Sequence, residues 1–358
     1  MEERDVFDLA PERLQRQFQD FQGLYAAELE NYLVGRATGP AVTWQRDYGS
    51  LEAYLQSVEG HRRRWHDVLG RFDADAVSDR PVESRLFHEE DAYRADWIEF
   101  EFLPGVMNRA VVATPRNTAQ PPPVVVLQHG IDSSPFQLFG LNDERGLYAA
   151  AGHRLARAGF AVVAPVNKSG RPARHRLECV AHVCGVSLFG LECYKLQRLI
   201  DALQTLPGLH VKRLAFAGLS LGGLMALFLT PIEMRIRAAV SAAWFNHRRR
   251  KLVVGDPKYS CFLEVDEPHI FLPGWLPEFS DSDLVSLICP RPLMIQTGKG
   301  DMIAWWPLVQ EEFAAARQHY DRLGLGERIE WLLHDGGHEF VYAPLEAFLR
   351  RWLVEDFE

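Results

Sequence analysis

The chain has 358 residues, of which 47% are hydrophobic and 24% charged, and its formal net charge is -9. This composition is typical of a soluble globular protein and excludes a disordered or fibrous chain. The length fits one large α/β domain, with or without an appendage. Because no basic segment offsets the acidic charge, nucleic acid is not expected as a partner.

Cysteine usage and the N-terminal segment indicate the compartment. Five scattered cysteines without a CxxC pair predict reduced thiols and no disulfide framework. The first thirty residues are densely charged, with no apolar signal-peptide core, and no later run reaches the length of a membrane span. We therefore expect a cytoplasmic protein that is not associated with a membrane.

Two amphipathic helices are predicted in residues 1–82, the N-terminal helical segment. Apolar residues recur every three or four positions from Pro11 to about Leu33, and again after Ser50, which can cap a second helix. The two helices fit a helical hairpin or a small subdomain. The sequence leaves open whether they mediate a homodimer, cover a pocket or pack on the core.

Residues 83–358 are predicted to form an α/β domain, opened by an antiparallel hairpin over residues 97–114 with a turn at Pro104-Gly105. Short apolar strands then alternate with helices, which predicts a doubly wound, mostly parallel sheet covered on both faces. The strands are expected at 124–127, 160–166, 213–217, 236–243, 292–297 and 328–333, and the helices at 144–158, 188–206, 221–230, 307–323 and 343–355. Two long connections that follow strand ends, 167–187 and 247–280, are expected to form a cap.

A candidate nucleophile lies between the third of these strands, 213–217, and the next helix, where Gly218-Leu219-Ser220-Leu221-Gly222 fits G-x-S-x-G. A sharp turn there exposes the Ser220 hydroxyl, and side chains at the glycine positions would collide with the neighbouring strand and helix. Leu221 N–H, at the helix N-terminus, is the expected first donor to an oxyanion. The turn Gln128-His129-Gly130-Ile131 follows a buried strand, so Ile131 N–H is the expected second donor.

A serine needs an imidazole base, and the imidazole needs an acid to orient it. Asp301 follows the strand 292–297, and His338 follows the last strand in a loop that contains two glycines. The chain order serine, aspartate, histidine favours these two residues as acid and base. The competing acids Asp281 and Asp283 are interpreted as helix-start residues, and Asp335 lies in the histidine loop, where His334 is the competing base.

Several side chains follow strand ends and are candidate substrate contacts. The aromatic residues Trp244, Trp305 and Trp306 suit sugars or aromatic acyl groups, although they also suit cap packing. The basic run 247–251 is interpreted either as a solvated face or as a site for an anionic substrate. The sequence contains no HExxH motif, so no metal is expected, and no cofactor is predicted.

Residues from about 95 to 355 resemble the α/β-hydrolase superfamily through the segments QHGIDSS, GLSLGGLMAL, DLVSLICPRPLMIQTGKGD and HDGGHEF. The branch that the chain resembles contains dienelactone-hydrolase-like and prolyl-oligopeptidase-like esterases, including acetyl-xylan-esterase-like proteins. Two features depart from it: position 220 is serine where dienelactone hydrolases have cysteine, and helices stand where prolyl oligopeptidases have a β-propeller. The resemblance implies an ester-type hydrolase rather than a peptidase.

The expected function is therefore hydrolysis of a small carboxylic ester through an acyl-enzyme on Ser220. Cleavage of a C–C bond or an amide on the same three side chains is the alternative, because function depends on the site rather than on the fold. A binding or scaffold protein without catalytic activity is a further alternative that the three residues disfavour.

Overall fold

The structure, a computed structural model, describes residues 11–39, 42–72, 77–78, 80–81, 83–116, 118–168, 170–265, 267 and 270–356. Among these residues nine strands form one sheet, in the order β1-β2-β3-β5-β4-β6-β7-β8-β9. The strands are β1 (Glu83–Glu89), β2 (Tyr93–Leu103), β3 (Val106–Pro115), β4 (Pro123–Gln128), β5 (Ala161–Pro165), β6 (His210–Leu219), β7 (Ile236–Ala242), β8 (Leu293–Gly298) and β9 (Ile329–His334). In this order the pairs from β1 to β5 are antiparallel. The pairs from β5 through β4 and β6 to β9 are parallel.

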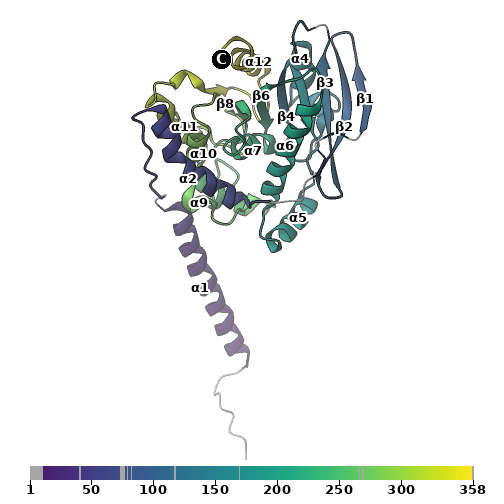
Figure 1. Cartoon of the computed structure of the whole chain (residues 1–358). Coiled ribbons are helices and arrows are strands. Elements are labelled where there is room, and N and C mark those ends of the chain that lie inside the picture. The colour runs from purple at the N-terminus through teal and green to yellow at the C-terminus, as the bar shows by residue number, and fades with distance from the viewer. Residues whose placement is uncertain are drawn as a thin grey trace, which may run out of the picture.

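Helices cover both faces of this sheet, so the fold is the doubly wound α/β arrangement that the sequence predicts (Figure 1). The helices are α1 (Pro11–Thr38), α2 (Leu51–Leu69), α3 (Pro135–Leu138), α4 (Ala151–Arg157), α5 (Arg171–Val183), α6 (Leu188–Thr205), α7 (Leu221–Leu229), α8 (Arg248–Val253), α9 (Trp275–Glu278), α10 (Asp281–Ile288), α11 (Trp306–Asp321) and α12 (Tyr342–Arg350). Shorter turns are η1 (Phe262–Glu264), η3 (Gly326–Arg328) and η4 (Arg351–Glu355). Core strands such as β4 and β8 are buried along their whole length, which explains their continuous apolar sequences.

Several elements differ from the sequence prediction. Helices α5, α8 and α9 lie in the two connections that were expected to form a cap, where no helix was predicted. Strand β1 was not predicted, because it is an edge strand whose described side chains are mostly exposed and leave no apolar period. The predicted helix 144–158 is helical only in α4. The Asp143 carboxylate accepts hydrogen bonds from the amides of Leu147 and Tyr148, and Ala150 has a φ of 49°, so the chain before α4 is a turn.

The two N-terminal helices do not pack on each other as a hairpin. Helix α2 packs against α6 and α10, and its Tyr54, Val58 and Trp65 are buried in the main core. Helix α1 contacts α8 and α9 only near its C-terminal end and otherwise projects from the body of the molecule (Figure 1). The two helices therefore belong to different environments.

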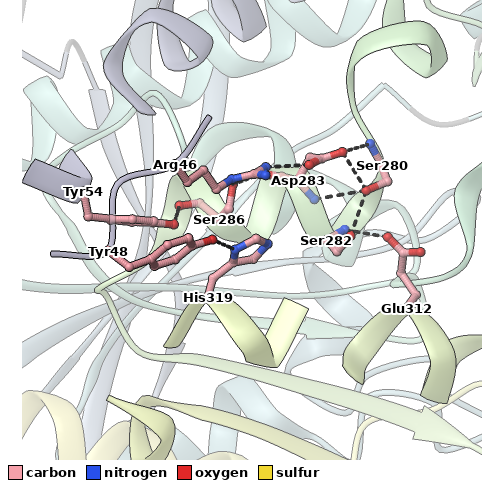
Figure 2. Close-up of polar contacts among 9 residues, drawn as sticks. All are labelled: Arg46, Tyr48, Tyr54, Ser280, Ser282, Asp283, Ser286, Glu312 and His319. Carbon is pink, nitrogen blue, oxygen red and sulfur yellow. Dashed lines mark hydrogen bonds and ion pairs between the residues drawn. The ribbon is translucent and has the colours of Figure 1, made fainter. Parts of the chain in front are cut away.

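Polar contacts attach the segment between α1 and α2 to α10 and α11 (Figure 2). Arg46 Nη2 lies 2.5 Å from Asp283 Oδ1 and donates to Ser286 Oγ. The Tyr48 hydroxyl lies 2.7 Å from His319 Nδ1. These contacts fix the start of α2 against the α/β core.

Among the described residues, no single helix has both the length and the apolar character needed to cross a membrane, although α5 and α6, with a 94° bend between them, meet both criteria as a pair.

Candidate active site

Ser220 occupies a strained turn between β6 and α7, with φ 59° and ψ -117°. The glycines on either side are required by close packing. A Cβ at Gly218 would lie 2.2 Å from the Gly222 backbone, and a Cβ at Gly222 would lie 2.2 Å from the Gln128 carbonyl oxygen. The turn thus has the tight geometry that the G-x-S-x-G pattern predicts.

Asp301 and His338 are brought into contact from the loops after β8 and β9. Asp301 Oδ2 lies 2.9 Å from His338 Nδ1, and Asp301 Oδ1 accepts a hydrogen bond from Ile303 N. The Asp301 side chain is only 1% exposed, so water does not compete with the imidazole for it. Held through Nδ1, the imidazole keeps its Nε2 available for a further partner.

A cavity of 760 Å³ contains Ser220 and His338 in its wall. Ile131, Leu221 and Trp244 also line it. The volume is in the range of small-molecule sites. Although both side chains face the same cavity, Ser220 Oγ is not hydrogen-bonded to His338 within the described structure; such contacts are often long in a ligand-free enzyme.

The two predicted oxyanion donors flank Ser220. Ile131 and Leu221 belong to the cavity wall, and neither backbone amide has a hydrogen-bond acceptor among the described residues. The loop after β4 lies close to Ser220, since a Cβ at Gly130 would lie 3.1 Å from Ser220 Cβ. Both amides are therefore free to bind an oxygen atom in the cavity.

His129 is a structural residue beneath this loop. It is fully buried, and burial lowers its pKa to about 4, so the ring is neutral at pH 7. Asn167 N donates to its Nε2, which leaves the proton on Nδ1 to be donated to the Gly130 carbonyl oxygen, 2.8 Å away. The neutral ring thereby links the loop after β4 to the chain after β5.

Tyr148 is a cavity residue that the sequence did not indicate. Its hydroxyl accepts a hydrogen bond from Gly130 N at 2.9 Å and donates one to Ser133 Oγ at 2.8 Å. Burial raises the pKa of the phenol, so it stays protonated. No short motif marks Tyr148, because the contact depends on two loops that meet only in the folded chain.

The cap segments contribute to the rim of the cavity. Arg171 of the first insertion lies 3.3 Å from Glu267 of the second, and burial raises the pKa of that glutamate. Both side chains line the cavity. The two predicted insertions thus meet over the candidate site.

Of the three aromatic candidates, only Trp244 lines the cavity. The ring of Trp305 lies under Lys258 Nζ at 4.2 Å, and Trp306 begins α11. Both are therefore placed outside the wall of this cavity.

The basic run 247–251 supplies no charge to the cavity wall. Arg248 is 1% exposed, pairs with the buried carboxylate of Asp281 at 2.8 Å and stacks on the Trp244 ring. Acidic side chains outnumber basic ones in the wall: Asp132, Asp143, Glu144 and Glu267 against Arg145 and Arg171. The interpretation of the run as an anion site is not supported. No cluster of His, Cys, Asp or Glu able to hold a metal ion occurs among the described residues.

The family follows from a comparison with known families. Residues 76–320, more than half of the chain, match the model of the Abhydrolase family. The chain belongs to this family, the α/β-hydrolases. The nine-stranded sheet and the turn at Ser220 are those of an α/β-hydrolase. No curated protein matches the sequence.

Solved structures similar to this α/β-hydrolase include three esterases. A provisionally assigned acetyl xylan esterase from Bacteroides fragilis has a TM-score of 0.67 and 17% identity, covering 85% of this chain and 81% of its own. A glucuronoyl esterase of carbohydrate esterase family 15 from Caldicellulosiruptor kristjansonii has a TM-score of 0.60 and 16% identity, covering 89% and 92%. A glucuronoyl esterase from Sporotrichum thermophile has a TM-score of 0.57 and 14% identity, covering 87% and 89%. At these identities the likeness shows the shared fold.

Proposed function

We propose that this α/β-hydrolase cleaves carboxylic esters of small molecules through an acyl-enzyme. The observation that carries the proposal is the buried Asp301–His338 contact, 2.9 Å long, at a cavity whose wall also contains the strained Ser220. The similar solved structures are named as carboxylic esterases, which supports ester hydrolysis rather than another reaction of the fold.

In the proposed reaction Ser220 Oγ attacks the ester carbonyl carbon while His338 Nε2 takes the hydroxyl proton. Asp301 stabilises the imidazolium that forms, and the N–H groups of Ile131 and Leu221 bind the oxyanion. His338 then donates the proton to the departing alkoxide, and the alcohol leaves. Water, deprotonated by the same imidazole, attacks the acyl-enzyme and releases the carboxylic acid.

The test uses a fluorophosphonate probe and short p-nitrophenyl esters on the purified protein, beside Ser220→Ala and His338→Ala. The probe is expected to label the wild type but not Ser220→Ala, and each substitution is expected to lower kcat by about 10⁴-fold or more. Circular dichroism of all three proteins controls for folding. A folded wild type that neither reacts with the probe nor hydrolyses any ester would contradict the proposal and favour a protein without catalytic activity.

Amide or C–C hydrolysis on the same side chains is the second candidate. It shares the probe result, so a substrate panel distinguishes it. Matched p-nitrophenyl esters and p-nitroanilides of one acyl group compare ester with amide cleavage, and a β-diketone reports C–C cleavage. We expect the ester to have the highest kcat/KM.

A further inference from the structure

Helix α1 carries an exposed apolar stripe, here called the α1 stripe: Phe18, Phe21, Tyr25, Leu29 and Tyr32. Spacings of three and four residues place these five side chains on one face of a helix. They are between 41% and 66% exposed. Scattered apolar side chains on a surface are ordinary, but a contiguous stripe of this kind indicates an interaction site.

The opposite face of α1 is polar or small. It carries Arg16, Gln19, Gly23, Ala27 and Glu30. The helix is therefore amphipathic in the part that projects from the body (Figure 1). Apart from the half-buried Leu14, every described side chain from residue 12 to residue 33 is exposed. In proteins most of the stability of a helix comes from the packing of its apolar face, so this face is expected to have a partner.

We infer that the partner is the α1 stripe of a second copy of this chain, giving a two-fold symmetric homodimer. Each exposed Phe, Tyr or Leu offers roughly 100 Å² of apolar surface, so pairing two stripes buries roughly 1,000 Å² in total. This area reaches the lower bound for a specific interface. Leu24 and Leu33, exposed beside the stripe, enlarge the area further.

Helix dipoles and shape favour an antiparallel pair. The four charges in the N-terminal half of α1, Glu12, Arg13, Arg16 and Asp20, cancel, so charge does not fix the orientation. An antiparallel pair opposes the two helix dipoles. It also places the two α/β bodies at opposite ends of the helix pair. A parallel pair would align the dipoles and crowd both bodies at one end.

The composition of α1 argues against a membrane as the partner. Helices that lie on membranes have an excess of Lys and Arg on the polar face. In α1 the bases Arg13, Arg16 and Arg36 are outnumbered by the acids Glu12, Asp20, Glu28 and Glu30. A nearly neutral amphipathic helix of this kind is compatible with a second copy of α1 as its partner.

The first test measures the molar mass of the full chain in solution. Light scattering after size exclusion is expected to give twice the monomer mass of 40.8 kDa for the wild type. Phe21→Asp/Tyr25→Asp buries two charges in the interface and is expected to weaken dimerisation at least 100-fold. The matched control, Gln19→Asp/Ala27→Asp, adds the same two charges to the opposite face and is expected to stay dimeric. Probe labelling of Ser220 checks that the body of each variant is folded.

The second test measures orientation. In a background of Cys179→Ser and Cys184→Ser, which removes the two exposed native thiols, Tyr25→Cys lies on the two-fold axis and is expected to form an intermolecular disulfide on mild oxidation. Phe18→Cys faces residue 32 of the other copy, so two such cysteines lie roughly 21 Å apart and are not expected to cross-link. Cross-linking at both positions would show a parallel pair.

Three results would overturn the inference. They are a monomeric wild type at 100 μM, a dimer that persists in Phe21→Asp/Tyr25→Asp, and binding to phosphatidylcholine–phosphatidylserine vesicles that the same substitutions abolish while the free protein is a monomer. Since α1 is remote from Ser220 in the chain and outside the cavity wall, loss of the dimer leaves the esterase test unaffected.

Discussion

Tyr148 couples two parts of the cavity wall through one oxygen atom. Its hydroxyl accepts from Gly130 N and donates to Ser133 Oγ, while Asp143 holds the Tyr148 amide. Because the peptide that follows Gly130 N–H carries the Ile131 amide, the phenol fixes the direction of an expected oxyanion donor. We therefore predict that Tyr148 is a positioning residue that acts through the backbone of this loop.

Tyr148→Phe removes the acceptor for Gly130 N and is expected to lower kcat for a p-nitrophenyl ester by about 10- to 100-fold, with KM changed less than about threefold. A displaced oxyanion donor lowers the stabilisation of the transition state more than the binding of the substrate. Steady-state kinetics measure the split. Tyr93→Phe, which also removes a buried hydroxyl but lies outside the cavity wall, is the control. An unchanged kcat in Tyr148→Phe would refute this role.

At the scale of elements, α10 and α11 enclose a buried carboxyl group. Glu312 of α11 is 7% exposed and accepts a hydrogen bond from Ser282 N at the start of α10 (Figure 2). Burial, and secondly the charge of Asp281, raise the pKa of Glu312 to about 7. The folded state therefore binds this proton more tightly than the unfolded chain, in which the pKa is near 4.5.

The raised pKa predicts a loss of stability with rising pH. The contribution of Glu312 is fully present below pH 4.5 and is lost as the pH rises through 7, by about 2 kcal/mol between pH 5 and pH 8. Glu312→Gln keeps the acceptor for Ser282 N but does not titrate. Urea unfolding at the two pH values should show that Glu312→Gln gains on the wild type at pH 8 and not at pH 5. An equal difference at both values would show that Glu312 does not titrate in this range.

At the scale of the whole molecule, α2 is part of the hydrolase core. Trp65 of α2 is fully buried, donates from Nε1 to the Phe228 carbonyl oxygen at 3.0 Å and packs edge-on against that ring. Phe228 belongs to α7, the helix that begins after Ser220. Helix α2 and the turn at Ser220 therefore share one packed unit.

Trp65→Ala is expected to lower the free energy of unfolding by about 3–5 kcal/mol through the cavity it leaves. Because α2 supports α7, the denaturant midpoint for probe labelling of Ser220 should fall together with that for helical circular dichroism. Gln19→Ala, on the exposed polar face of α1, is the control and should change neither. If only the helical signal moved, α2 would be an independent unit.

The local sequence was enough to predict the elements that have a periodic or continuous apolar pattern, or a short motif. Continuous apolar residues indicate buried strands such as β4. The flanking glycines indicate the turn at Ser220, where the fold leaves no room for a Cβ. Chain order then selected Asp301 and His338, because parallel strands end at one edge of the sheet and bring their following loops together. The structure places these two side chains in contact.

Only the folded structure showed the features that no apolar period or short motif in the sequence encodes. Strand β1 forms by pairing with the edge of β2. The chain before α4 is a turn rather than a helix because the Asp143 carboxylate accepts hydrogen bonds from its amides. The sequence left the basic run 247–251 open between a solvated face and an anion site, whereas in the folded chain Arg248 is buried in an ion pair with Asp281. Each outcome rests on a hydrogen bond or ion pair between residues that no periodic pattern connects, so it appears only when the chain has folded.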